Sequence, residues 1–154
     1  MISKKLALEV LNLATSTGAD FAEIYLEENN SSAIMLDNCK VESCQDSLTY
    51  GAGIRLLKGL QSVYGYTNDI SKKGLKKLAL SLSASFYEER CVEVKEISKV
   101  RVPKKHHPRI KYSDYKKEDL IKMLSEASEE CLKYDSRIVR CRASFSCNYK
   151  DVEI

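Results

Sequence analysis

The stretch from residue 50 to residue 71 constrains the fold more than any other part of the sequence. It reads YGAGIRLLKGLQSVYGYTNDIS, and its first half alternates with the two-residue period of a half-buried strand. Gly51 and Gly53 share one face of that strand, so another backbone or side chain can approach closely there. Lys58-Gly59 is typical of a tight hairpin turn, because glycine tolerates a positive φ.

The return strand of this hairpin leads directly into a helix. The strand runs through Val63 to Tyr66 and ends at Thr67-Asn68-Asp69. Ser71 is suitably placed to accept a hydrogen bond from a free N–H in the first helical turn. The helix from residue 72 to about residue 86 has an apolar stripe, which we expect to lie across the sheet.

Hydrophobic periodicity predicts the remaining elements. They begin with a helix over residues 4–17, strands over 21–28, 32–36 and 39–45 with a turn at 29–31, and a candidate strand over 91–94. A further helix, capped by Ser113 or Asp114, ends near Tyr134 and has Leu120, Leu124, Ala127, Cys131 and Tyr134 facing the core. A strand over 137–149 follows it, before a turn at 150–151. We expect that last strand to lack a return strand, and its open edge to make isolated chains self-associate.

These elements predict an α+β fold. A mostly antiparallel sheet of four to five strands packs with two helices and is followed by a second helix–strand unit that is left incomplete. The predicted boundaries are 1–99 for the N-terminal domain, 100–112 for a basic linker that contains proline, and 113–154 for the second unit.

Composition favours a soluble protein. The chain of 154 residues is 44% apolar and 31% charged and contains no long apolar run, which excludes a typical membrane-spanning helix. Lys4 and Lys5 lead into a helix interrupted by polar residues rather than into a secretory signal. We therefore expect a cytoplasmic protein. A net charge of +3 is too small to indicate a nucleic-acid partner by itself.

The usual residues of a catalytic or metal site are absent or badly spaced. The six cysteines form no C-x-x-C pair, so reduced thiols are expected. His106 and His107 are adjacent, and their diverging side chains cannot readily hold one ion. Glu23 and Glu27 share a strand face but have no nucleophile or pocket beside them, which favours surface charge. We predict no catalytic residue and no metal ligand in this chain.

Four lysines crowd the first turns of the helix that begins at residue 72. They are Lys72, Lys73, Lys76 and Lys77. Their charge opposes the helix dipole, which favours acidic side chains at this end. One interpretation is a solvated lysine face. The other is a cluster that docks onto an acidic surface of another domain or subunit.

The ordered motifs of the chain resemble the N-terminal domain of the TldD/PmbA family, called in older naming the modulators of DNA gyrase. The resemblance extends over nearly the whole chain. The matching positions are Gly51-x-Gly53-Ile54-Arg55, Gly59, Asn68-Asp69-Ile70-Ser71, and the segments 18–25, 41–43 and 134–139. Two positions depart from the family pattern. Cys39 stands where a turn glycine is common, so we expect the positive φ at Asn38, and Val63 stands where TldD-like members often have glycine.

The resemblance implies a function for the longer protein. Full-length members resemble zinc metallopeptidases with an HExxxH motif, and they act as two-subunit cytosolic proteases on unfolded peptides, including peptide maturation. This sequence contains no such motif, so zinc is expected only in a catalytic domain beyond residue 154. The chain would be the non-catalytic scaffold and assembly part, with a homologous subunit as its partner, and the Gly51-x-Gly53-hydrophobic-Arg55 match favours the TldD type.

Two other function classes remain open. A free-standing interaction module would pair with a full-length partner through exposed sheet edges. A nucleic-acid-associated regulator is supported only weakly by the basic segment 101–111, because no aromatic residues interleave it. Metal analysis with a peptidase assay separates an enzyme from a module, and a salt titration of DNA binding tests the regulator.

Overall fold

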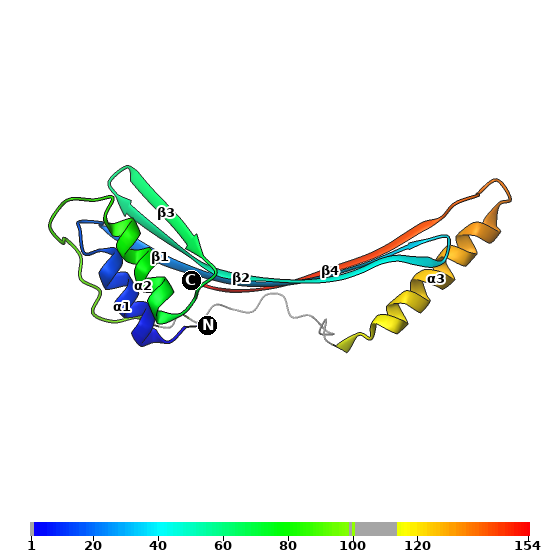
Figure 1. The fold of residues 1–154 in the computed structure, drawn as a ribbon, viewed down its shortest axis with the longest axis horizontal. Coiled ribbons are helices and arrows are strands. Elements are labelled where there is room, and N and C mark those ends of the chain that lie inside the picture. Colours follow the sequence, from blue (N-terminus) through cyan, green and yellow to red (C-terminus); the bar gives the residue numbers. More distant parts are fainter. Residues whose placement is uncertain (1, 99, 101–113) are drawn as a thin grey trace. The chain divides into compact units, whose positions relative to one another are not determined.

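The computed structural model describes residues 2–98, 100 and 114–154. Its elements, in chain order, are α1 (Lys4–Ala14), β1 (Phe21–Asp37), β2 (Lys40–Lys58), β3 (Gln61–Thr67), α2 (Lys72–Ser83), α3 (Lys117–Tyr134) and β4 (Arg142–Glu153) (Figure 1). The strands form one sheet in the order β3-β2-β1-β4. The predicted α+β class is confirmed.

Contacts along the chain divide it into two compact units. The first unit gathers residues from 1–28, 49–102 and 151–154, and the second gathers residues from 29–48 and 103–150. Each unit thus combines segments that are distant in sequence. The boundaries predicted along the chain, at residues 99 and 113, remain a prediction, and the predicted linker 100–112 lies outside the described residues except for residue 100.

The core of the first unit lies between the sheet and helices α1 and α2. Ala52, Ile54 and Leu56 on β2 are buried, as their alternation predicts, and they pack in one cluster with Val10 of α1 and Leu75 of α2. Burying a Val, Ile or Leu side chain contributes about 1.5–3 kcal/mol to the stability of the fold. The alternation therefore decides which face of the sheet the helices cover.

The core of the second unit lies under α3. Leu120 and Leu124 pack with Ile34 and Leu36 of β1. The predicted continuation of the stripe is wrong, because Ala127, Cys131 and Tyr134 are exposed and the buried position is Ser128. The buried positions of α3 are four residues apart, at 120, 124 and 128. Because residue 128 is a serine, hydrophobic periodicity alone does not reveal that this position is buried.

Several predicted boundaries need correction. β1 runs through the predicted turn at 29–31, and β4 runs through the predicted turn at 150–151. Residues 91–94 form no strand; the Asn12 side chain instead exchanges two hydrogen bonds with the backbone of Val94, at 2.8 and 3.1 Å. Because β4 lies beside β1, it is an outer strand of the sheet rather than an unpaired one. Self-association through its outer edge stays a prediction.

The helix ends also differ from those predicted. α1 ends at Ala14 and α2 at Ser83, each a few residues earlier than the apolar periodicity suggests. α3 begins at Lys117 after Lys116, which makes no side-chain cap, so Asp114 is not its cap, and Ser113 lies outside the described residues. The first turn of α3 instead contains the acidic side chains Glu118 and Asp119, which stabilise the N-terminal end of a helix through its dipole.

The turn between β1 and β2 has two residues with positive φ. Asn38 has a φ of 46° and Cys39 a φ of 64°, which is the pattern of a type I′ hairpin turn. The expectation for Asn38 is confirmed, and Cys39 adopts the same conformation. The Asn38 side chain offsets part of the cost of this backbone conformation by accepting a hydrogen bond of 2.9 Å from the Cys141 N–H.

The Cys39→Gly substitution should stabilise the chain by roughly 0.5–1 kcal/mol. The left-handed conformation costs a residue with a Cβ about 1–2 kcal/mol, and the greater freedom of glycine in the unfolded chain offsets part of that gain. Urea denaturation at neutral pH measures the change. The matched control is Asn38→Gly, which removes the side-chain acceptor and should not stabilise. A loss of stability in Cys39→Gly would contradict this account.

An ion-pair cluster joins α1 to α2. Glu9 Oε2 lies 2.6 Å from Lys76 Nζ and 2.9 Å from Lys72 Nζ. Hydrogen bonds from Lys76 and then Lys72 lower the pKa of Glu9 from its ordinary 4.5 to about 2. The charged carboxylate is therefore favoured in the folded chain.

This cluster predicts a pH-dependent loss of stability. A carboxylate with a depressed folded pKa stabilises fully above its unfolded pKa, and the effect disappears as the pH falls from 4.5 towards 2. The Glu9→Gln variant should lose less stability than the wild type over that interval. Unfolding free energies at several pH values measure the difference, with the exposed Glu93→Gln as control. Parallel curves for wild type and Glu9→Gln would refute the role of Glu9.

Candidate interaction surface

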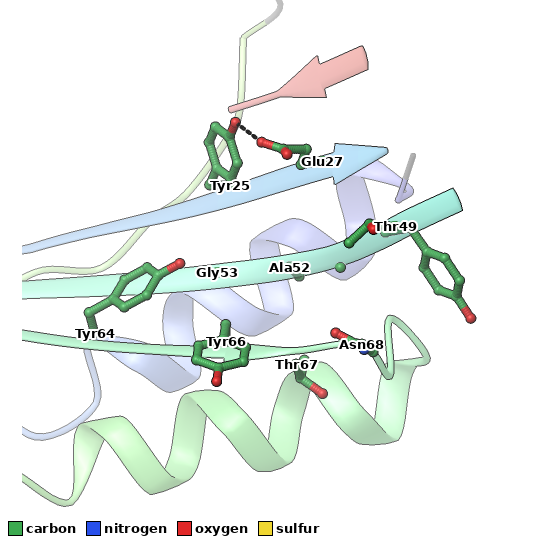
Figure 2. Close-up of a pocket in the computed structure, with 11 residues that line it drawn as sticks. Tyr25, Glu27, Thr49, Ala52, Gly53, Tyr64, Tyr66, Thr67 and Asn68 are labelled. Carbon is green, nitrogen blue, oxygen red and sulfur yellow. Dashed lines mark hydrogen bonds between the residues drawn. The ribbon is translucent and has the colours of Figure 1, made fainter. Parts of the chain in front are cut away.

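The face of the sheet opposite α1 and α2 carries an open pocket in the first unit. We call it the tyrosine pocket, and its principal lining residues are Tyr25, Glu27, Gly53, Tyr64, Tyr66 and Thr67 (Figure 2). Its volume is about 210 Å³. The pocket lies across β1, β2 and β3, so three strands that are paired side by side position its lining residues.

Alternation along β3 explains why tyrosines occupy this face. A Cβ on Gly65 would lie 2.9 Å from Leu78 of α2, so position 65 faces the helix. Tyr64 and Tyr66 therefore point to the opposite side, and they are 58% and 77% exposed. Opposite them on β2 stand Arg55 and Gly53, respectively. The result is an amphipathic aromatic surface that no helix of the first unit covers.

The two predicted glycines have different close neighbours. A Cβ on Gly53 would lie 2.5 Å from the Tyr64 hydroxyl oxygen and 2.9 Å from a ring carbon, and Figure 2 shows the Tyr64 side chain directed towards Gly53. A Cβ on Gly51 would lie 2.9 Å from the Thr67 carbonyl oxygen. The absence of a Cβ thus lets the Tyr64 side chain approach Gly53 and the Thr67 backbone approach Gly51.

Charged groups on this face are paired. The Tyr25 hydroxyl donates to Glu27 (Figure 2), and this hydrogen bond raises the pKa of Tyr25. Arg55 Nε lies 2.8 Å from Glu23 Oε1. Neither carboxylate therefore stands as an isolated acid or base beside a nucleophile, and Arg55 of the family motif serves as the partner of Glu23.

The remaining motif residues build the two ends of β3. Gly59 follows β2 with a φ of 53°, and its N–H donates to Asp20 Oδ2 at 2.9 Å. At the other end the Ser71 N–H donates to Asp69 Oδ1, at 3.0 Å, and Ser71 Oγ accepts from the Gly74 N–H at 3.1 Å. The predicted cap is confirmed. Hydrogen bonds to the Asp69 carboxylate from the Ser71 side chain and then from the Ser71 backbone lower the pKa of Asp69.

Sequence reasoning missed one residue of this corner. A Cβ on Gly74 would lie 2.3 Å from the Asp69 carbonyl oxygen, so only glycine fits against the turn. The available signal was a glycine three positions after a capping serine, where helix propensity disfavours it. Asn68 contributes to the rim of the tyrosine pocket. The tyrosines themselves were also missed, although Tyr64 and Tyr66 alternate visibly in the sequence.

The four candidate docking lysines divide into two pairs. Lys72 and Lys76 bind Glu9 within the first unit, whereas Lys73 and Lys77 are exposed on α2. The intramolecular partner accounts for half of the cluster. Docking of the cluster onto an acidic surface stays a prediction. Lys73 and Lys77 are now the better candidates for it, because Lys72 and Lys76 pair with Glu9.

Within 2–98, 100 and 114–154, no group of three His, Cys, Asp or Glu side chains could hold a metal ion. His106 and His107 lie outside this range. No helix in the same part of the chain is long and apolar enough to cross a membrane.

Three solved structures share this fold. A candidate modulator of DNA gyrase from Bacteroides thetaiotaomicron matches 99% of this chain with a TM-score of 0.68 and 21% identity. A second candidate modulator, from Thermotoga maritima, matches 97% with a TM-score of 0.64 and 15% identity. TldE from Thermococcus kodakarensis also matches 97%, with a TM-score of 0.60 and 13% identity.

The comparisons also define how much of a longer protein is present. The chain spans 37% of the Bacteroides protein and 34% of each of the other two. No curated protein matches it significantly. Residues 22–85 match the family model for domain 1 of the PmbA/TldA metallopeptidases, and this range holds β2, β3, α2 and all of β1 except its first residue. Residues 22–85 are therefore similar to domain 1 of the PmbA/TldA metallopeptidases, and the fold of the chain is similar to that of the three solved structures.

Proposed function

We propose that the chain is a non-catalytic scaffold and assembly domain of a TldD/PmbA-type protein, and that the tyrosine pocket is part of its contact with the rest of the assembly. The proteolysis of unfolded peptides by the assembly would then take place at a zinc site outside residues 1–154. The observation that carries the proposal is the aromatic face of β1, β2 and β3, which the helices of the first unit leave open.

The chemistry of this face suits a protein contact. Tyrosine combines a large apolar ring with a hydroxyl that can hydrogen-bond, and tyrosine is enriched at the energetic centres of interfaces. Tyr64 is already held over Gly53, so it loses little conformational freedom on binding. Glu23 and Glu27 are paired within the face, which reduces the cost of covering them.

The residues of the described part do not fit a catalytic zinc site. The family's metal chemistry needs three protein ligands around an open coordination position, and residues 2–98, 100 and 114–154 contain no group of that kind. No catalytic step is therefore assigned to any residue in the described part of the chain. The neighbours are nearly three times as long, by the fraction of them that the chain covers, which supports a division of labour between this part and another.

A second candidate, the free-standing module, is favoured by one observation. β3 and β4 are the outer strands of the sheet, and outer strands can pair with a strand of another protein. The two proposals use different groups. Assembly through the tyrosine pocket depends on side chains of one face, whereas edge pairing depends on backbone N–H and C=O groups.

The Tyr66→Ser variant should weaken binding to a full-length TldD/PmbA-type subunit by about tenfold or more, the effect of losing an aromatic residue at the centre of an interface. Tyr87→Ser is the matched control, because Tyr87 is 93% exposed and does not line the pocket. Isothermal titration calorimetry measures both. Wild-type affinity in Tyr66→Ser would refute the tyrosine pocket as the contact and leave edge pairing.

The purified chain should contain no stoichiometric zinc and should not cleave a disordered substrate such as casein. Elemental analysis after dialysis against zinc, followed by a peptidase assay, measures both properties. If metal is found, a His106→Ala, His107→Ala double variant identifies whether these side chains hold it. Zinc at one equivalent together with cleavage would overturn the non-catalytic role.

A further inference from the structure

Residues 88–98, which we call the strap, lie along α1 in the first unit without forming a helix or a strand. At the start of the strap the Glu88 N–H donates to the Thr17 carbonyl oxygen at 3.2 Å. Near its end the Ile97 carbonyl oxygen accepts from Lys4 Nζ at 3.4 Å. The strap therefore runs antiparallel to α1, from the C-terminal end of the helix to its N-terminal end.

The Asn12 side chain of α1 binds the backbone of one strap residue through both of its polar atoms. Its Nδ2 donates to the Val94 carbonyl oxygen at 2.8 Å, and its Oδ1 accepts from the Val94 N–H at 3.1 Å. A side-chain amide offers one donor and one acceptor to the same residue in this way, as a neighbouring strand does. The contact thus recognises the peptide backbone and not the Val94 side chain.

Two side chains of the strap donate to backbone carbonyl groups of α1 and of the turn after it. Arg90 Nη2 donates to the Asn12 carbonyl oxygen at 2.8 Å. Cys91 Sγ lies 3.4 Å from the carbonyl oxygens of both Gly18 and Ala19. A Cβ on Gly18 would lie 2.7 Å from a side-chain atom of the strap, so this glycine permits the close approach.

The strap lies outside the hydrophobic core. Val92, Val94 and Ile97 are half-buried, and among the described residues none of the strap belongs to the core cluster of the first unit. Asn12 is two positions after the fully buried Val10, and residues two positions apart in a helix point in nearly opposite directions. The strap is therefore held mainly by hydrogen bonds on the outer side of α1, and it can detach locally without opening the core.

We propose that the outer face of α1 is a peptide-binding site whose resident occupant is the strap, and that a segment of a partner protein with the same chemistry can replace it. The segment must offer a non-helical backbone to Asn12. Four positions before that contact it needs a basic side chain, as Arg90 is in the strap. Two positions earlier it needs an acidic one, as Glu88 is, for the ion pair with Lys58. No residue of α1 lines the tyrosine pocket, so this site does not depend on that contact.

The strap competes with the partner segment for the same groups of α1. The apparent affinity for an added peptide is the intrinsic affinity reduced to the fraction of chains in which the strap has detached. A substitution in the strap itself should therefore strengthen the binding of an added wild-type peptide. A substitution of Asn12 weakens the strap and the peptide alike, so it is informative only together with a change in the peptide.

The test measures binding of a fluorescein-labelled synthetic peptide of residues 87–98 to the full chain, by fluorescence anisotropy in the presence of a reducing agent. The Arg90→Ala chain should bind this peptide about three- to tenfold more tightly than the wild type, because the strap loses a hydrogen bond that the peptide keeps. The matched control is the Glu93→Gln chain, changed at an exposed strap residue, which should bind as the wild type does. Circular dichroism checks that each variant is folded.

Recognition of the backbone is tested with a second peptide that is methylated on the Val94 nitrogen. This change removes the N–H that donates to Asn12 Oδ1 and should weaken binding about tenfold, the effect of leaving that acceptor unpaired. A peptide methylated on the Glu93 nitrogen is the control, since that N–H has no partner among the described residues.

The Asn12→Ala chain completes the comparison. The unmodified peptide and the peptide methylated at Val94 should bind this chain equally, because the side chain that distinguishes them is absent. Equal binding of the two peptides to the wild type, or no binding of the unmodified peptide to the Arg90→Ala chain, would overturn the proposal.

Discussion

The burial of one face of β2 determines what the other face can do. Ala52, Ile54 and Leu56 are buried against α1 and α2, and because side chains alternate along a strand, this commits Gly53 and Arg55 to the opposite side. The pairing of β2 with β3 then places Tyr64 and Tyr66 on that same side. The open aromatic surface is thus a consequence of where the helices bind, and a shift of one residue in register would bury the tyrosines and expose the core.

The parts of the fold that sequence reasoning predicted are those where a local rule has a strong physical cause. The hairpin turn at Gly59 and the cap at Ser71 follow from backbone conformation and from hydrogen bonds within a few residues. The buried positions of β2 follow from strict alternation. Each of these features depends on neighbours in the sequence, so the sequence displays it directly.

The features that were missed depend on distant partners. Asn29 to Ser31 has the composition of a turn, yet β1 continues through it, since the long neighbouring strands accept its backbone hydrogen bonds. Ser128 is buried although it is polar. The tyrosine pocket likewise needs the order of three strands, which alternation in any one strand does not reveal.

The division into two units has a consequence for synthesis of the chain. The first unit includes residues 151–154 together with residues from the N-terminal half, and the second takes 29–48 from the middle of the first. Neither unit can complete its contacts until residues up to about 150 have left the ribosome. Formation of the native state is therefore a late event dominated by pairings between remote segments, which slows it relative to a helical protein of the same length.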